Sequence, residues 1–129
     1  MLKFDEYSRI AQVAVRHAQN AFVSDEKLAA EWQALRFHDR PDMEVSMSEY
    51  EVFLTLLDCD EVIELPAADT LTIDSIYTRD SILISPNGLI LCNMGRASRT
   101  PEAKANAAAY QAAGHRVAGE ICAPGTLEG

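Results

Sequence analysis

The chain has 129 residues, of which 48% are hydrophobic, and its formal net charge is −9. These values predict one globular domain, 1–129, without an internal boundary. The acidic balance argues against a nucleic-acid-binding surface, which needs a basic stripe, and against binding to an anionic membrane. No apolar run approaches the roughly 20 residues that span a bilayer, and no secretory signal pattern opens the chain, so we expect a cytoplasmic protein.

The first half of the chain predicts strands and helices in alternation. Residues 10–15 (IAQVAV) alternate enough to predict a strand. Ser24 is the expected start of a helix, which ends before Pro41. Ser46 and Glu49 form a capping-box pattern that predicts a helix over 46–58, and a short strand is expected over 61–65.

Residues 81–122 predict the order strand, strand, helix, strand. Strands over 81–85 and 88–92 flank a hairpin turn with a three-residue loop, in which Gly88 takes a left-handed conformation. Both strands are apolar at consecutive positions, so we expect burial on both faces. A helix from Thr100 to Gly114 follows, with three residues facing inward: Ala103, Ala107 and Tyr110. A strand over 115–122 completes an α/β unit, of which the first half of the chain is a less regular version.

The three cysteines, Cys59, Cys92 and Cys122, are widely spaced and form no CxxC pair. This spacing argues against a zinc or redox site. We expect three reduced thiols that pack as small hydrophobic residues.

Three polar segments lie just outside the predicted elements, where an α/β fold usually places its site: residues 74–80 (DSIYTRD), 95–99 (GRASR) and 123–129 (APGTLEG). Carboxylates bind a guanidinium through paired, charge-assisted hydrogen bonds, and an arginine can hold the carboxylate of an amino acid. The spacing alone allows a second interpretation. Asp74 would then cap a turn, Asp80 would pair with Arg79, and Arg96 and Arg99 would lie on the surface.

The segments DSIYTRD, SRTPE and APGTLEG, in this order and at these separations, resemble the guanidino-group-modifying enzyme superfamily. This superfamily contains arginine deiminases, dimethylarginine dimethylaminohydrolases and amidinotransferases, and the likeness is closest to the bacterial dimethylarginine dimethylaminohydrolase-like branch. The resemblance covers residues 60–129 well and residues 10–59 more loosely. It implies part of an α/β-propeller (pentein) built of ββαβ modules, with about two of its five modules present.

The resemblance also implies roles for individual residues. Asp80 and Glu128 match the two catalytic carboxylates that bind the substrate guanidinium, and Asp74 matches an acid lining the same pocket. Arg99 matches an arginine near the amino-acid end of the substrate. Arg79 stands where some dimethylarginine hydrolases carry glutamate, which leaves the choice between arginine and methylated arginine open.

In this superfamily a cysteine thiolate near the C-terminus attacks the guanidinium carbon to give a thiouronium intermediate, and a histidine moves protons. Neither a metal nor a cofactor takes part. The resemblance implies that this nucleophile lies downstream of the TLEG motif and outside the chain. Cys122, which is predicted to lie in a strand, is not expected to replace it, and neither are Cys59 and Cys92. By residue type alone, the candidates for the proton shuttle are His17, His38 and His115.

The resemblance therefore implies the N-terminal portion of a C–N hydrolase acting on arginine or a methylated arginine. We expect this portion to be inactive alone, and to self-associate or to pair with a missing C-terminal part. Two alternatives stay open. One is an amidinotransferase, in which an amine resolves the intermediate, and the other is a noncatalytic arginine-binding or assembly module.

Overall fold

A computed structural model describes residue 5 and residues 7–128. In this part of the chain the strands form two sheets, and helices and strands are mixed as in an α/β fold. The first sheet pairs β1 (Ile10–Val15) with β2 (Cys59–Glu64) in parallel, and Ile10 lies opposite Cys59. The strand predicted over 10–15 is therefore confirmed, and the strand predicted over 61–65 begins two residues earlier than expected.

The second sheet has the strand order β3-β4-β5. The strands are β3 (Ile82–Ser85), β4 (Gly88–Leu91) and β5 (Val117–Glu120), and α4 (Glu102–Ala112) joins β4 to β5. β3 is antiparallel to β4, whereas β4 and β5 are parallel. This order confirms the predicted succession of strand, strand, helix and strand. The hairpin loop is shorter than predicted, because Ser85 already pairs with Gly88.

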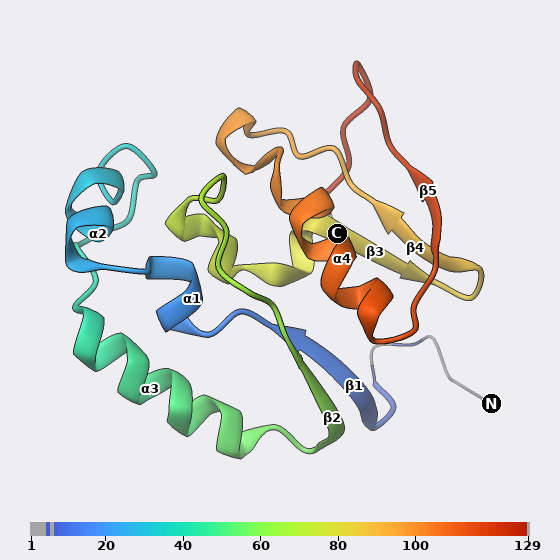
Figure 1. The fold of residues 1–129 in the computed structure, drawn as a ribbon, viewed down its shortest axis with the longest axis horizontal. Helices are drawn as coiled ribbons and strands as arrows, with labels where there is room; N and C mark the ends of the chain where they lie inside the picture. The colour runs from blue at the N-terminus through green and yellow to red at the C-terminus, as the bar shows by residue number, and fades with distance from the viewer. Residues whose placement is uncertain (1–4, 6, 129) are drawn as a thin grey trace.

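Helix α4 lies against the second sheet on the side of the first sheet, and joins the two (Figure 1). The core cluster around it consists of residues from β2, β3, β4 and α4, together with Leu65, which directly follows β2. Its members are Ile63, Leu65, Ile82, Leu89, Leu91, Ala103, Ala107 and Tyr110. The three residues that were predicted to face inward from this helix are all in this list. Alanines allow the helix to approach the strands closely, because they add little bulk at the contact.

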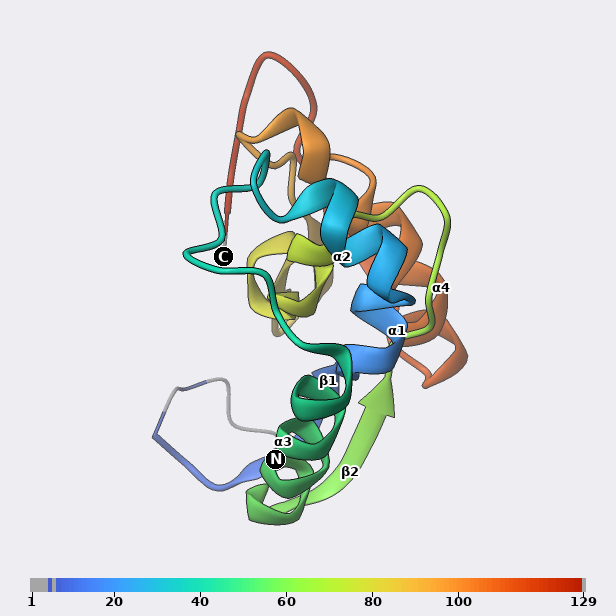
Figure 2. The ribbon, with the colours of Figure 1, turned by 90° about the vertical axis from the view of Figure 1, so that its left-hand side faces the viewer.

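A second core cluster lies beneath the three helices that follow β1 and precede β2 in the sequence. These are α1 (Ala18–Phe22), α2 (Asp25–Glu31) and α3 (Met43–Leu56), seen from their own side in Figure 2. Its buried members come from α1, α2 and the short 3₁₀ helix η1 (Ile73–Ile76): Ala18, Ala21, Phe22, Leu28 and Ile73. None of the described helices is long and apolar enough to cross a membrane.

The N-terminus of α3 differs from the prediction. Asp42 is the N-cap, and its Oδ1 accepts a hydrogen bond from the Val45 N–H at 2.9 Å. Ser46 and Glu49 therefore lie inside the helix, and the capping-box assignment is wrong. An aspartate at the N-cap accepts a hydrogen bond from a free backbone N–H, and its negative charge interacts favourably with the positive end of the helix dipole. Both interactions stabilise a helix that starts after Asp42. The short helix α1 was not predicted.

Two burial predictions are also wrong for the described chain. Leu83 and Ile84 of β3 are 40% and 59% exposed, so this strand is not buried on both faces. Successive strand residues point to opposite faces, so β3, an edge strand of the second sheet, is incompletely covered on both. Cys122 is exposed, because β5 ends at Glu120 and the cysteine lies in the segment beyond it. Cys92 is buried and Cys59 is partly buried, and all three thiols are free, as expected.

The hairpin glycine provides a test of the second sheet. Gly88 has φ +121°, and a Cβ there would meet the Arg116 carbonyl oxygen at 2.6 Å. That oxygen cannot move easily, because it accepts the Leu89 N–H at 2.9 Å. We expect Gly88→Ala to lower the free energy of unfolding by about 3 kcal/mol or more, from backbone strain plus overlap.

Two matched glycine-to-alanine variants separate these two causes in urea denaturation. Gly114 has φ +91° but nothing within 4 Å of its Cβ position, so Gly114→Ala should show strain alone, about 1–2 kcal/mol. Gly119 also has open space there and an unstrained φ, so Gly119→Ala should be nearly neutral. Equal losses at Gly88 and Gly114 would contradict the overlap with Arg116.

Candidate functional site

The topology of the second sheet brings the three polar segments to one edge. β4 and β5 are parallel, so their carboxyl ends lie at the same edge, and the antiparallel β3 begins there. The short 3₁₀ helix η2 (Thr78–Ser81) enters β3 at this edge, residues 92–99 leave β4 there, and residues 121–128 leave β5 there. The polar segments are therefore neighbours in space although they are up to about fifty residues apart in sequence.

Residues 93–99, which we call the site loop, contact all three acids identified from the sequence. The Gly95 N–H donates to Glu128 Oε1 at 3.0 Å. Arg96 Nη1 donates to Asp74 Oδ2 at 2.8 Å, and Arg99 Nη1 donates to Asp80 Oδ2 at 2.7 Å. One stretch of seven residues thus binds two carboxylates of residues 74–80 and one of residues 123–129.

The segment that carries Glu128 is also tied to the site loop through Asn93. Its carbonyl oxygen accepts the Leu127 N–H at 3.0 Å, and its Nδ2 donates to the Gly125 carbonyl oxygen at 2.6 Å. Glu128 is exposed and the Asp80 side chain is 33% exposed, so both carboxylates can be reached from solvent. By contrast, the side chain of Asp74 is 5% exposed.

Arg99 is buried behind Asp80 and makes four hydrogen bonds. Its Nε and Nη2 donate to the two carboxylate oxygens of Glu102, each at 2.8 Å. Its Nη2 also donates to the Tyr77 carbonyl oxygen at 2.8 Å. Burial opposes the charge of Arg99, but the hydrogen bonds and charges of Glu102 and Asp80 raise its pKa above the ordinary value. Arg99 is therefore a permanent cation held rigidly against Asp80.

A second buried cation supports the segment that carries Asp74 and Asp80. Arg16, at the end of β1, is fully buried, and its Nη1 donates to the Ser75 carbonyl oxygen at 3.0 Å. Its Nη2 donates to Asn106 Oδ1, and Asn106 Nδ2 donates to Ser81 Oγ at 2.9 Å. Residues 74–81 are thus held from β1 at one end and from α4 at the other.

Cys92 lies beside the site but has the wrong environment for a nucleophile. Burial raises the pKa of its thiol above the ordinary value, and the negative charges of Asp80 and Glu128 raise it further. A catalytic cysteine instead needs a stabilised thiolate, usually near a cation or a helix N-terminus.

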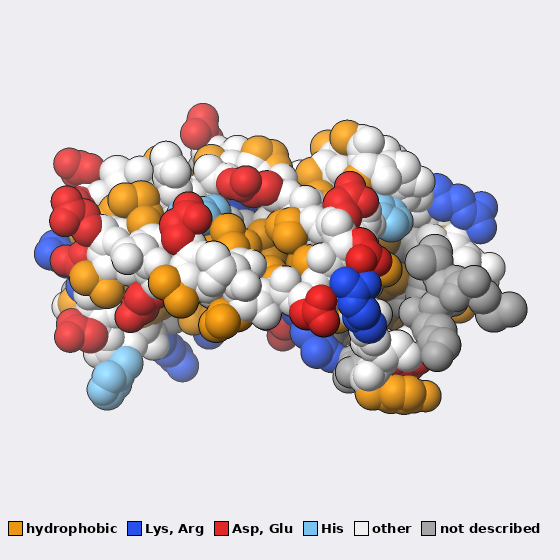
Figure 3. Space-filling model, turned by 90° about the horizontal axis from the view of Figure 1, so that it is seen from below, with side chains coloured by type: hydrophobic (Ala, Val, Ile, Leu, Met, Phe, Trp, Pro, Cys, Tyr) orange, Lys and Arg blue, Asp and Glu red, His pale blue; other side chains and the backbone are white. Residues whose placement is uncertain are grey.

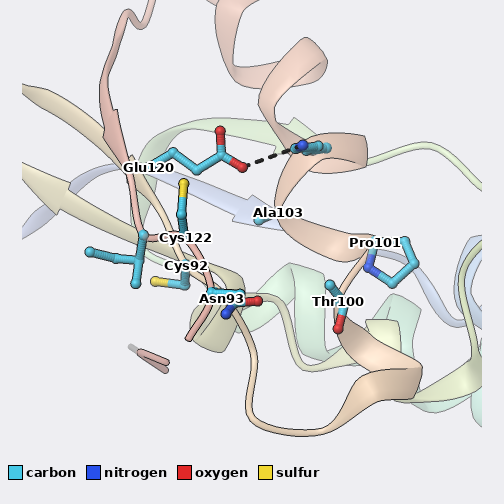
Figure 4. A pocket seen from close by; sticks show the side chains of 10 residues that line it. Cys92, Asn93, Thr100, Pro101, Ala103, Glu120 and Cys122 are labelled. Atoms are coloured by element: carbon cyan, nitrogen blue, oxygen red, sulfur yellow. Dashed lines mark ion pairs between the residues drawn. The ribbon is translucent and has the colours of Figure 1, made fainter. Parts of the chain in front are cut away.

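A pocket of about 350 Å³ opens between the start of α4 and the end of β5, and Cys92 and Cys122 both line it (Figure 4). The Lys104–Glu120 ion pair, 3.4 Å long, stands at its side. The pocket lining contains none of the three acids. The pocket and the cluster of three acids are therefore separate features of the described chain.

The partly or fully buried histidines have structural partners. His17 Nδ1 accepts the Gln19 N–H at 3.0 Å, so Nε2 carries the proton and donates to Glu51 Oε1 at 3.0 Å. His115 bonds to Gln12, which ties the end of α4 to β1. His38 is exposed. Among the described residues no group of three or more His, Cys, Asp or Glu side chains is arranged to hold a metal ion.

Sequence reasoning missed the buried polar residues behind the acids, Arg16, Glu102 and Asn106. Glu102 and Asn106 are four residues apart on the inward face of α4, next to Ala103 and Tyr110. Polar residues on the buried stripe of a helix are a signal of a buried network, because such groups must be paired. That signal was present in the sequence.

The fold of the described chain is similar to part of the fold of solved dimethylarginine dimethylaminohydrolase structures. One of these, an adduct with S-methyl-L-thiocitrulline, aligns with a TM-score of 0.66 and 22% identity over 92% of this chain and 44% of that chain. A second, an adduct with 4-chloro-2-hydroxymethylpyridine, has a TM-score of 0.65 and 22% identity over 92% of this chain and 43% of that chain.

A third similar structure is a cysteine-to-serine variant of the enzyme from Pseudomonas aeruginosa, in complex with citrulline. It has a TM-score of 0.65 and 20% identity, and the alignment covers 94% of this chain and 45% of that chain. The chain thus spans less than half the length of the structures it matches. No protein-family model matches the chain, and no curated protein matches it. The resemblance to the dimethylarginine dimethylaminohydrolase-like branch, which rested on three motifs, is therefore matched by similarity of the fold.

Proposed function

We propose that this chain supplies the guanidinium-binding part of an enzyme that hydrolyses a C–N bond of arginine or a methylated arginine. The observation that carries the proposal is the site loop, which holds Asp74, Asp80 and Glu128 at one edge of the second sheet. A cluster of carboxylates fits a cationic, planar group with several N–H donors. The similarity to solved structures supports the same class of substrate.

In the proposed mechanism Asp80 and Glu128 bind the guanidinium and keep it cationic and aligned. The free guanidinium is a poor electrophile, so alignment beside a thiolate accounts for much of the expected rate enhancement. The thiolate forms a bond to the guanidinium carbon, ammonia or an alkylamine leaves, and water then releases a ureido product and the thiol. We place the thiol in further polypeptide. Burial and the charges of two carboxylates raise the pKa of Cys92, and Cys122 lines the pocket between α4 and β5, which contains none of the three acids.

The further polypeptide would also cover apolar surface that this chain leaves exposed. Four large side chains of α3 are at least 42% exposed: Val45, Val52, Phe53 and Leu56. A groove of about 540 Å³ lies between α3, β1 and the η1–η2 segment, and hydrophobic side chains gather in the middle of this face (Figure 3). We propose that the remaining modules of the propeller pack here, since patches of this kind usually mark interaction surfaces.

Calorimetric titration tests the binding proposal with the protein as it stands. L-Arginine and asymmetric dimethylarginine should bind at one site, and L-lysine, equally cationic but without a planar fork of donors, should bind at least roughly tenfold more weakly. Equal binding of lysine, or no binding of either guanidino compound, would rule out a guanidinium site. Ureido product is expected only when the cysteine-bearing part of the enzyme is present, and released ammonia or alkylamine then identifies the substrate.

A second candidate is a noncatalytic arginine-binding or assembly module. The environment of Cys92 favours it for this chain alone, because burial and the charges of Asp80 and Glu128 raise the pKa of this thiol. The two candidates differ in turnover: a binding module takes up arginine without releasing ammonia, alkylamine or a ureido product in any longer form of the protein. Amidino transfer would instead give product only when an amine acceptor is added.

A further inference from the structure

A continuous series of buried hydrogen bonds connects the first sheet with the segment that carries Asp80. Arg16 directly follows β1, Asn106 lies on α4, and both side chains are fully buried. Arg16 Nη2 donates to Asn106 Oδ1, and Asn106 Nδ2 donates to Ser81 Oγ at 2.9 Å. Ser81 Oγ in turn donates to the Thr78 carbonyl oxygen at 3.3 Å. The series therefore starts at β1, passes through α4 and ends inside η2.

The chemistry of its members gives this series one direction. An arginine carries N–H donors and no acceptor, so the amide of Asn106 has to turn its oxygen toward Arg16. The amide NH₂ group then faces Ser81, whose hydroxyl accepts this bond and keeps its own hydrogen for Thr78. A side chain at position 106 that lacks either the acceptor or the donor breaks the series at a defined point.

Ser81 is the residue through which the series reaches the candidate site. It directly follows Asp80 and is fully buried, and its carbonyl oxygen accepts the Cys92 N–H at 3.0 Å. The backbone next to Asp80 is thus held by α4 on one side and by the end of β4 on the other. Arg99 instead holds the carboxylate of Asp80, at 2.7 Å. The backbone and the carboxylate of this acid are therefore fixed by separate contacts.

We propose that Asn106 is a positioning residue of the guanidinium site, which acts on Asp80 through Ser81. This inference rests on the proposed function and adds a residue that lies outside the three polar segments. Binding groups have to be held within about 0.5 Å of the productive geometry, so a small shift of the Asp80 backbone weakens binding without unfolding the chain.

The test uses agmatine, which carries the guanidinium of arginine but no carboxylate, and calorimetric titration of the whole protein. Asn106→Leu removes both bonds of the amide, and Ser81→Ala removes the last two bonds of the series. Asn106→Asp keeps an acceptor for Arg16 but has no N–H for Ser81. We expect each variant to bind agmatine roughly tenfold more weakly, with an unchanged number of binding sites.

Urea denaturation of the same samples separates positioning from stability. Asn106→Asp should unfold at a higher urea concentration than Asn106→Leu, because its carboxylate pairs with Arg16, and yet both should lose agmatine affinity by a similar factor. A merely structural role would leave the dissociation constant of the folded fraction unchanged in both. The double variant Asn106→Leu/Ser81→Ala should bind agmatine about as well as either single variant, because Asn106 acts through Ser81. Losses that multiply would contradict this route.

Ser85→Ala is the matched control for Ser81→Ala. The two serines stand at opposite ends of β3, and Ser85 Oγ also donates to a backbone carbonyl, that of Gly88 at 2.7 Å. We expect unchanged agmatine affinity in this control, and an equal loss in both serine variants would contradict the inference.

The outcomes also separate this inference from the proposed function. If the unmodified protein does not bind agmatine, the guanidinium site is wrong and the role of Asn106 is wrong with it. If the unmodified protein binds agmatine and the variants at positions 106 and 81 bind it equally well, the guanidinium site stands and the positioning role is wrong.

Discussion

Replacing Asp80 with asparagine should weaken binding of agmatine by roughly 10- to 100-fold, as expected when a charge-assisted hydrogen bond to a cation is lost. Asparagine keeps the shape of the side chain and can still accept the Arg99 Nη1–H, which lies 2.7 Å from Asp80 Oδ2. The fold should therefore persist while the negative charge that attracts the guanidinium disappears. Calorimetric titration of both forms with agmatine measures the difference.

Asp60→Asn is the matched control for this experiment. Asp60 also accepts a hydrogen bond from an arginine, Arg9 Nη1 at 2.6 Å, but both side chains are more than half exposed and lie near the start of the first sheet. Removing this surface charge should leave agmatine affinity unchanged, because screened surface charges contribute little at a distance. If both variants weakened binding equally, the effect would come from net charge and not from a specific carboxylate.

Arg16→Met should give the largest loss of stability among the polar residues of the chain, about 3–5 kcal/mol in urea denaturation. Methionine has a similar length but removes hydrogen bonds to Pro66, Ser75 and Asn106, and it leaves the acceptor atoms of the buried Ser75 and Asn106 without this donor. It also removes a positive charge near Glu102, which stays buried. The segment from Asp74 to Ser81 should loosen, so agmatine affinity should fall as well.

Arg9→Met provides the comparison, since it makes the same chemical change at an exposed position. Arg9 pairs with Asp58 and Asp60 at the surface, and its side chain is 55% exposed. We expect no measurable change in the midpoint of unfolding or in agmatine affinity. A stability loss at Arg16 no larger than that at Arg9 would show that the buried network contributes nothing beyond packing.

Elements set by local pattern were predictable from the sequence. The hairpin followed from Gly88, and α4 followed from a proline at its start, a glycine at its end and alanines on its inward face. The start of α3 was not predictable in this way, because two capping patterns lie within five residues of each other and Asp42 forms the cap. The exposure of Leu83 and Ile84 could not be predicted, since it depends on the place of β3 at the edge of the second sheet.

The acids of the candidate site were found through motifs, but the pairing of the buried residues behind them could not be predicted, because these contacts join distant residues. Arg16 and Asn106 are 90 residues apart, and Arg96 and Asp74 are 22 apart. Local periodicity carries no information about such pairs. The role implied for Arg99 came from the motif alone, whereas its hydrogen bonds to Glu102 and Asp80 became visible only with the side chains in place.

A crystal structure of the protein with agmatine bound would test the convergence of Asp80 and Glu128 on one flat cation. We predict that the guanidinium lies at the edge where the site loop leaves β4, with N–H groups about 3 Å from a carboxylate oxygen of each residue. A guanidinium that contacts one of these acids alone, or that binds in the pocket beside Cys122, would contradict the shared site.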